Sequence, residues 1–209
     1  MLRDQRAKFS SCENVSSFEA CGKADMLKAF YDRLRGLCAE NGASSWASRR
    51  ERIEGEAKQA RAAADEFGIL RSAGTEWAKF RREADLHVGS EHVVELSVSR
   101  GRVGKMTIPG AFGLMPLIVE HPVVNLRNDP SLPATRRAIE FGPATPLEYL
   151  SRWVDANDLF NDDVSLTSLV EWDDGQLSFG ITQPQYDGAE APLREIEEFF
   201  VASGWSHIV

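Results

Sequence analysis

Cysteine is scarce in this sequence, and its spacing excludes the usual disulfide and zinc frameworks. The 209 residues contain three cysteines, Cys12, Cys21 and Cys38, all in the N-terminal fifth. An odd number without a CxxC pair predicts free thiols. The four histidines have no accompanying cysteine or carboxylate pattern, and His87 and His92 are five residues apart on a strand-like segment. They would point to opposite faces, so we expect no shared metal site.

Long apolar runs are also missing. No stretch approaches the roughly 20 apolar residues that cross a bilayer, and the polar first 21 residues lack the apolar core of a secretory signal. We therefore expect a cytoplasmic protein without a membrane span. The sequence has no internal repeat or low-complexity segment, and hydrophobic residues make up 43% of it, which is typical of a globular domain.

Common enzyme fingerprints are absent as well. The sequence contains no GxSxG, P-loop or Rossmann pattern, which leaves hydrolase, NTPase and dehydrogenase functions unsupported. The formal charge of -8 repels nucleic-acid phosphates overall, so nucleic acid is not an expected partner. One basic segment, Arg49 to Arg61, could contact RNA or DNA, but the glutamates interleaved in it favour an ordinary solvated helix face.

The N-terminal part has helical periodicity. Apolar residues recur at three- and four-residue steps from Ala24 to Glu40, where Asn41-Gly42 ends the pattern. A thinner apolar stripe predicts a second helix over Ser45–Phe67, although Gly55 weakens it, and a short third helix follows over Trp77–Asp85. We expect residues 1–85 to form a helical arm.

The second part is predicted to be rich in strands. Residues 91–98 and 103–107 form a hairpin, and residues 164–172 and 176–183 form another around Asp173-Asp174-Gly175. The long proline-containing stretch from 109 to 143 exceeds ordinary connections. It is either a functional flap or an insertion, with one short strand around residues 117–124.

Two helices complete the second part. Thr145, Pro146 and Glu148 predict the start of a helix that runs to about Phe160, with a capping box between Thr145 and Glu148. Its residues Leu147, Leu150, Trp153 or Val154, and Leu159 can face a sheet, while Arg152, Asp155 and Asp158 can face water. A final amphipathic helix spans about 192–202. The sequence thus predicts an α+β fold in which residues 86–209 form an antiparallel sheet with one packed helix and a C-terminal helix.

The order of these elements, and several short segments, resemble a protein-kinase small lobe. At residue level the chain is similar to the Ser/Thr/Tyr protein-kinase domain found in polyvalent proteins of phages and mobile elements. The similarity covers about the last three-fifths of the chain and is moderately specific as a set. It is carried by Gly89–His92, Gly104–Thr107, Ala144–Leu150, Asn157–Asp163 and Gln183–Gly188.

The resemblance implies a site for ATP with magnesium. Lys105 would neutralise the α- and β-phosphates, and a helix carboxylate, Glu148, would hold its amine in place. Two other interpretations stay open: Glu148 is only the capping-box partner of Thr145, or Lys105 is a solvated strand lysine.

Further contacts are implied on either side of Lys105. Gly89 and Ser90 would belong to the hairpin that covers the phosphates, although the full GxGxxG pattern is missing. Gln183 to Tyr186 would form the linker whose backbone meets the adenine edge. A strand that ends at a proline and leads into a turn explains these linker residues as well.

The machinery for phosphoryl transfer is not recognisable. No HRD or DFG sequence occurs in the chain, and kinases need these groups to orient the acceptor and hold magnesium. We therefore expect no catalytic residue, and a kinase-like domain, whether a pseudokinase, a truncated kinase or a fragment of a longer kinase, that binds ATP. The alternative is an acidic phage or mobile-element protein that inhibits a host partner such as a nucleic-acid-binding defence complex.

The apolar residues of the final helix predict that this helix contacts another part of the chain or another protein. Its apolar residues Leu193, Ile196, Phe199 and Phe200 would pack on a large lobe in a complete kinase. Exposed apolar surface of this kind marks a contact. We expect the helical arm or another chain to cover it, which predicts a protein partner or a homodimer.

Overall fold

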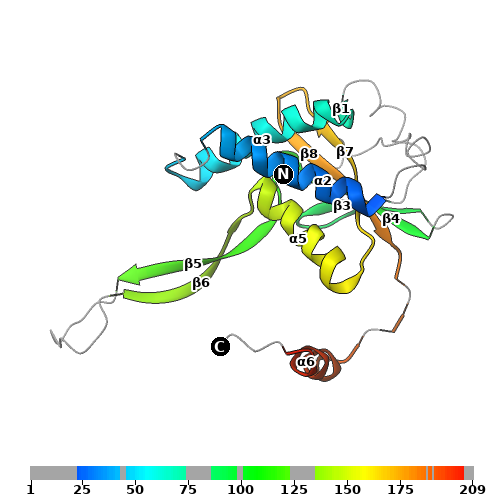
Figure 1. The fold of residues 1–209 in the computed structure, drawn as a ribbon. Coiled ribbons are helices and arrows are strands. Elements are labelled where there is room, and N and C mark those ends of the chain that lie inside the picture. Colours follow the sequence, from blue (N-terminus) through cyan, green and yellow to red (C-terminus); the bar gives the residue numbers. More distant parts are fainter. Residues whose placement is uncertain are drawn as a thin grey trace.

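The computed structural model describes residues 23–42, 46–73, 86–97, 101–122, 135–186, 188–189 and 191–204. Within these ranges the chain has an α+β fold with helices at its N-terminal side, as the sequence predicts (Figure 1). The elements are α2 (Lys23–Glu40), α3 (Arg49–Glu66), β1 (Leu70–Ser72), β2 (Leu86–Val88), β3 (His92–Ser97), β4 (Arg102–Thr107), β5 (Leu114–Pro122), β6 (Thr135–Pro143), α5 (Pro146–Phe160), β7 (Ser165–Glu171), β8 (Leu177–Pro184) and α6 (Leu193–Ala202).

Six strands form the main sheet in the order β1-β7-β8-β4-β3-β2. The predicted hairpins are both present, as the antiparallel pairs β3–β4 and β7–β8. Strand β4 lies in the interior of the sheet because β8 pairs with its other edge. Strand β1 runs parallel to its neighbour β7, whereas the other strand pairs of the described sheet are antiparallel. The turns before β4 and β8 contain Gly101 and Gly175 at positive φ, which glycine adopts without steric cost.

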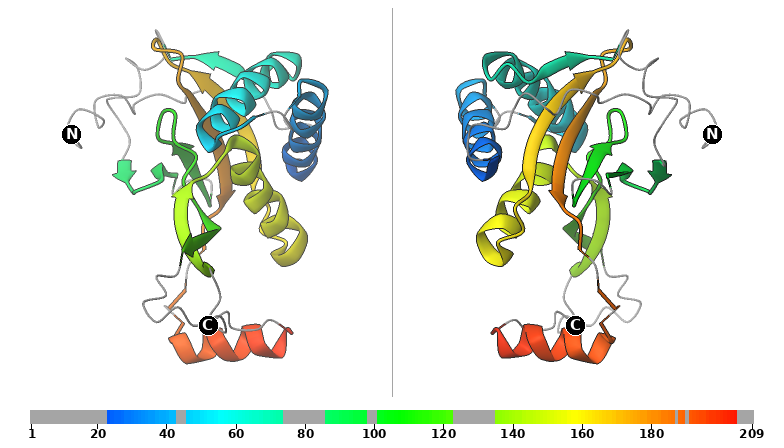
Figure 2. Two further views of the ribbon diagram at one scale, coloured as in Figure 1. Left: turned by 90° about the vertical axis from the view of Figure 1, so that its left-hand side faces the viewer. Right: turned by 90° about the vertical axis from the view of Figure 1, so that its right-hand side faces the viewer.

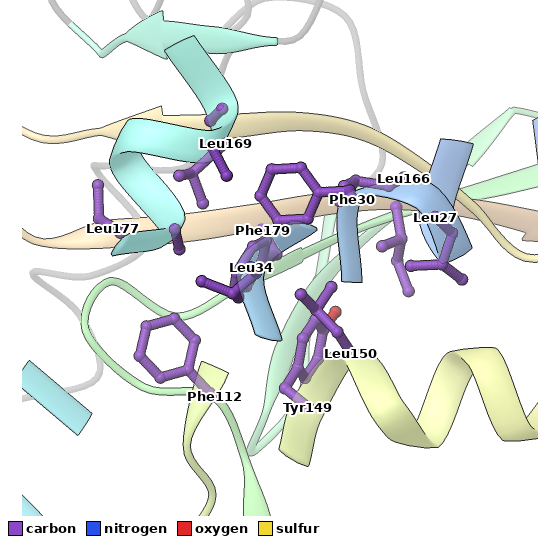
Figure 3. Packing of buried hydrophobic residues seen from close by; sticks show 14 of the residues in the cluster. Leu27, Phe30, Leu34, Phe112, Tyr149, Leu150, Leu166, Leu169, Leu177 and Phe179 are labelled. Carbon is purple, nitrogen blue, oxygen red and sulfur yellow. The ribbon is translucent and has the colours of Figure 1, made fainter. Parts of the chain in front are cut away.

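One face of the main sheet carries the core, beneath α2, α3 and α5 (Figures 1 and 2). Phe30 of α2 contacts Phe67 and Phe179 edge to face, with ring centroids 5.6 and 6.3 Å apart. Tyr149 of α5 stacks on Phe179 of β8 (Figure 3). The helices predicted as an arm therefore share one core with α5, β7 and β8. The boundary at residue 85 stays a prediction.

Helix α3 begins where its capping residue lies. Ser48 accepts a hydrogen bond from the Glu51 backbone, and the Glu51 side chain accepts one from the Ser48 backbone, so the helix starts at Arg49 and not at Ser45. Gly55 does not break it. A Cβ there would overlap the Trp46 ring, so this position needs glycine for close packing. The predicted helix over 77–85 lies outside the described residues.

Helix α5 confirms the predicted capping box but not the whole predicted apolar face. Tyr149, Leu150 and Val154 are buried, whereas Leu159 is 60% exposed. The prediction for Leu159 was wrong because, at 100° per residue, it lies about 140° around the helix from Val154. Asn161 then ends the helix in the left-handed conformation.

The stretch from 109 to 143 contains two nine-residue strands, β5 and β6, and not the single short strand expected. They pair antiparallel from Leu114–Pro143 to Pro122–Thr135 and project from the body of the molecule (Figure 1). The prolines in this stretch do not prevent strand pairing. In a two-stranded ribbon, Pro116 and Pro122 can direct the missing N–H toward the open edge, where no partner strand requires it.

Among the described residues, the N-terminal helices α2 and α3 do not cover helix α6. None of its residues is buried, and Leu193 and Phe199 are 70% and 59% exposed. Helices α2 and α3 pack on α5 and β7 instead. Phe200 of α6 contacts Phe160 at the end of α5, with ring centroids 6.5 Å apart. In the described part of the chain, no helix is both long and apolar enough to span a membrane.

Candidate functional site

Lys105 lies on the interior strand β4 and faces the core side of the sheet. It is directly opposite Ile181, which is buried, and residues opposite each other across a strand pair share a face. Its Nζ is 5.3 Å from the centroid of the Trp153 ring of α5, a cation–π distance. Burial lowers the pKa of the amine, and the charges of Asp162 and Glu91 partly oppose this shift. The side chain is thus a partly desolvated cation next to an aromatic ring.

Glu148 has partners other than Lys105. Its Oε2 accepts hydrogen bonds from Arg49 Nη2 at 2.5 Å and from the Thr145 backbone at 2.8 Å, and its Oε1 accepts one from Arg49 Nη1 at 3.3 Å. Among the described residues, no carboxylate lies within 4.0 Å of the Lys105 amine. The expected Lys105–Glu148 pair is therefore not formed, and Glu148 has the capping role left open above. Its partner Arg49, 99 residues away, could not be anticipated from local sequence patterns.

A buried polar cluster adjoins Lys105, and local sequence patterns scarcely predict it. His92 of β3 is 9% exposed, and its Nε2 is 3.1 Å from the Tyr149 hydroxyl. The His92 ring also meets Trp153 edge to face. Burial lowers the pKa of His92 to about 4, with Lys105 and Arg152 adding to the shift and Glu91 opposing it. The i, i+4 spacing of Tyr149 and Trp153 was the available signal, since it places both rings on one helix face.

Arg152 of α5 contacts the protein and does not simply face water. It forms an ion pair with Glu91 and lies over the Tyr149 ring, 5.5 Å from its centroid. It also donates a hydrogen bond to the Phe112 carbonyl. Gly113, at φ +83°, lies so close to the Glu91 carboxylate that a Cβ would overlap it. These contacts hold the segment between β4 and β5 against the start of β3.

The predicted linker residues lie at one end of the sheet. Gln183 is opposite Val103 in the β8–β4 pair, next to the strand that carries Lys105. The Tyr186 hydroxyl donates to Asp162, with 2.5 Å to Oδ1, and this bond raises the pKa of the hydroxyl. Nearby, Arg102 Nη1 donates to Asp163 Oδ2 at 2.6 Å. The segment after β8 is thus fastened to the loop that follows α5.

Gly89 and Ser90 lie at the opposite end of β4. They form the turn between β2 and β3, closed by a hydrogen bond from the Gly89 backbone to the His92 carbonyl, and both are exposed. His92 pairs with Thr107, whereas the backbone of Gln185 bonds to Gly101. At about 3.3 Å per residue, the turn and the linker are roughly 20 Å apart. The structure therefore places Gln183 two residues along the β4–β8 pair from Lys105, with Gly89–Ser90 and Tyr186 at either end of the strands and Glu148 paired with Arg49.

The basic segment of α3 is paired with acidic residues. Arg49, Arg50, Arg52 and Arg61 form ion pairs with Glu148, Glu54, Glu56 and Glu171 respectively. These contacts fit the interpretation of an ordinary helix face. Cys38 is a buried free thiol, as predicted, and burial raises its pKa to about 11. Cys12 and Cys21 lie outside the described residues, among which no group of metal-binding side chains is found.

Comparisons with protein-family models, curated proteins and solved structures gave no match to this chain.

Proposed function

We propose that the chain is a kinase-like domain that binds a nucleoside triphosphate through Lys105. The observation that carries this proposal is the environment of the lysine. A cation that is partly desolvated and has no carboxylate within ion-pairing distance among the described residues can gain from an anionic ligand. Phosphate oxygens are such a ligand, and lysine binds them as a compact point charge.

The order of the elements also supports the proposal. Strands β2, β3 and β4 form a meander, α5 then crosses the sheet face, and β7 and β8 return as a hairpin whose second strand pairs with β4. In this arrangement α5 lies over β4, the strand that carries Lys105, and β8 is the neighbour of β4 in the sheet. The proposal concerns binding of ATP, with or without magnesium; phosphoryl transfer needs further aspartate and asparagine side chains.

Calorimetric titration with ATP, with and without magnesium, tests the proposal. Wild-type protein should release heat at submillimolar to millimolar nucleotide, and Lys105→Met should weaken binding at least about tenfold, as expected when a charge-assisted contact worth about 1.5–3 kcal/mol is lost. Lys58→Met, which removes an exposed lysine of α3, is the matched control and should bind normally. Absence of heat at millimolar ATP, or equal binding by both variants, would contradict the proposal.

A second candidate function is inhibition of a partner protein, in which this acidic chain binds a basic surface of the partner. The observation that favours it is α6, which exposes Leu193 and Phe199 and carries three glutamates and one arginine. Such a helix matches an apolar groove with a basic rim. Pull-down from a host lysate, repeated across a salt series, would test this function. A captured protein should no longer bind at high salt, and it should not bind the Glu195→Lys variant. Capture that is unaffected by both changes would contradict this second function.

A further inference from the structure

The β5–β6 hairpin exposes an apolar face that the body of the protein does not cover. Residues of even number on β5 and odd number on β6 share this face, because they are opposite each other in the strand register. Its four large apolar side chains, Leu114, Ile118, Ile139 and Phe141, are between 51% and 74% exposed. A two-stranded ribbon is at best marginally stable in water on its own. This face, which is called the hairpin face below, is therefore a candidate contact surface.

The edges of the ribbon favour contact through the face and not through added strands. Pro116 and Pro122 lie within β5, which pairs with β6 on one side, and Pro143 ends β6. Proline offers no N–H to a strand that would extend the sheet, and native proteins use it to block such edges. Face-to-face packing of two sheets needs no edge hydrogen bonds, only apolar side chains that interdigitate.

The charges on the hairpin face favour a second copy of this chain as the partner. Glu120 and Arg137 are opposite each other beyond the apolar side chains, with Glu120 Oε1 3.1 Å from Arg137 Nε. The hairpin face thus carries one charge of each sign, although the whole chain has a formal charge of -8. Two acidic molecules repel each other less through such a face than through α6, where glutamates predominate.

We propose that two copies of this chain associate through their hairpin faces, around a two-fold axis parallel to the ribbon. This rotation places β5 of one copy over β6 of the other. Ile118 then contacts the partner's Ile139, and Glu120 lies over the partner's Arg137. Because the axis is two-fold, Arg137 also lies over the partner's Glu120, so two pairs of opposite charge form between the copies. The hairpin face is self-complementary in this arrangement, as a two-fold interface requires.

Sedimentation of the full chain tests the association. Wild-type protein should be dimeric at about 100 μM, a concentration at which even weak specific dimers form, and Phe141→Asp should be monomeric at the same concentration. Phe199→Asp, which places the same charge on the exposed face of α6, is the matched control and should remain dimeric. A monomeric wild type would overturn the proposal, as would a dimer that Phe199→Asp dissociates and Phe141→Asp does not.

Charge reversal separates contacts between copies from folding of the hairpin. Glu120→Arg places two positive charges on the hairpin face, and Arg137→Glu places two negative charges there. Each variant alone should dimerise at least about tenfold more weakly, because like charges then meet across the axis. Mixed in equal amounts they should restore association as a heterodimer, since all four cross-axis charges are then opposite. Failure of the mixture to associate better than either variant would overturn the proposed axis even if both variants are folded.

Discussion

Phe179 and Phe141 are both phenylalanines on β-strands, yet Phe179 is fully buried and Phe141 is 71% exposed. Phe179 lies beneath three helices and contacts the rings of Phe30, Phe112 and Tyr149. Phe141 lies on a ribbon that projects from the body and has one partner strand. The body and the hairpin therefore use similar residues for different purposes: the body buries its apolar side chains within the chain, and the hairpin presents them to the outside.

The first prediction compares these two phenylalanines directly. Phe179→Ala should lower the free energy of unfolding by about 3–5 kcal/mol, because it leaves a cavity in the core and removes three ring contacts. Phe141→Ala should change it by less than about 0.5 kcal/mol at low protein concentration, as exposed positions usually do. Urea denaturation followed by circular dichroism measures both values. Similar losses for the two variants would mean that the hairpin and the body do not differ in this way.

The second prediction concerns Glu56, a carboxylate that is 1% exposed in the body. It pairs with Arg52 and accepts a hydrogen bond from the Leu147 backbone at 2.9 Å, which joins α3 to the first turn of α5. Glu56→Ala should cost about 2–3 kcal/mol of unfolding free energy, because the partly buried Leu147 N–H and an arginine lose a charged acceptor. Glu54→Ala, which breaks the exposed pair with Arg50, should cost at most about 0.5 kcal/mol.

The third prediction uses the pH dependence of the body. The pKa of His92 is about 4 in the folded protein and about 6.5 in an unfolded chain. Between these values the unfolded state binds more protons, so stability is greatest above pH 6.5 and falls as the pH approaches 4. The full pKa difference of about 2.5 corresponds to about 3–4 kcal/mol of unfolding free energy, at about 1.4 kcal/mol for each pKa unit, and most of this loss should be complete by pH 4.

His92→Gln is the control for that pH dependence. It retains a hydrogen-bonding side chain opposite Tyr149 but does not titrate, so the slope of unfolding free energy against pH should decrease between pH 6.5 and 4. The carboxylates still titrate in both proteins, and the difference between the two slopes isolates the histidine. An unchanged slope would show that water reaches His92 in the folded state.

The helices of the body could be predicted from the sequence because their signals are local. The spacing of Leu27, Phe30 and Leu34 defines the buried face of α2, and Thr145, Pro146 and Glu148 define the start of α5. The hairpin could not be predicted as well. Its strands are joined through residues 123–134, and its prolines resemble signals for irregular structure until the open edges of the ribbon are known.

The candidate site also contains both features that could be predicted from the sequence and features that could not. Lys105 is predicted from the resemblance and from its strand; the structure places that strand in the interior of the sheet, and the nucleotide-binding role of Lys105 stays a prediction. The partners of the site residues were not predictable, since they come from distant parts of the chain. Trp153 lies over Lys105, Arg49 pairs with Glu148, and Tyr149 contacts His92, and each pairing depends on how α5 crosses the sheet.

The smallest predicted effect lies at the junction between the hairpin and the body. Two residues after β6, Thr145 caps α5 from a fully buried position, and Arg49 donates to the Pro143 carbonyl at 2.6 Å. Thr145→Ala should cost about 1–2 kcal/mol, whereas Ser48→Ala, at the exposed cap of α3, should cost about 0.5–1 kcal/mol. Hydrogen exchange should show faster exchange in the first turn of α5 for Thr145→Ala, with little change in β5 and β6. Faster exchange throughout the hairpin would mean instead that the cap of α5 also stabilises the ribbon, and the two regions would then unfold together.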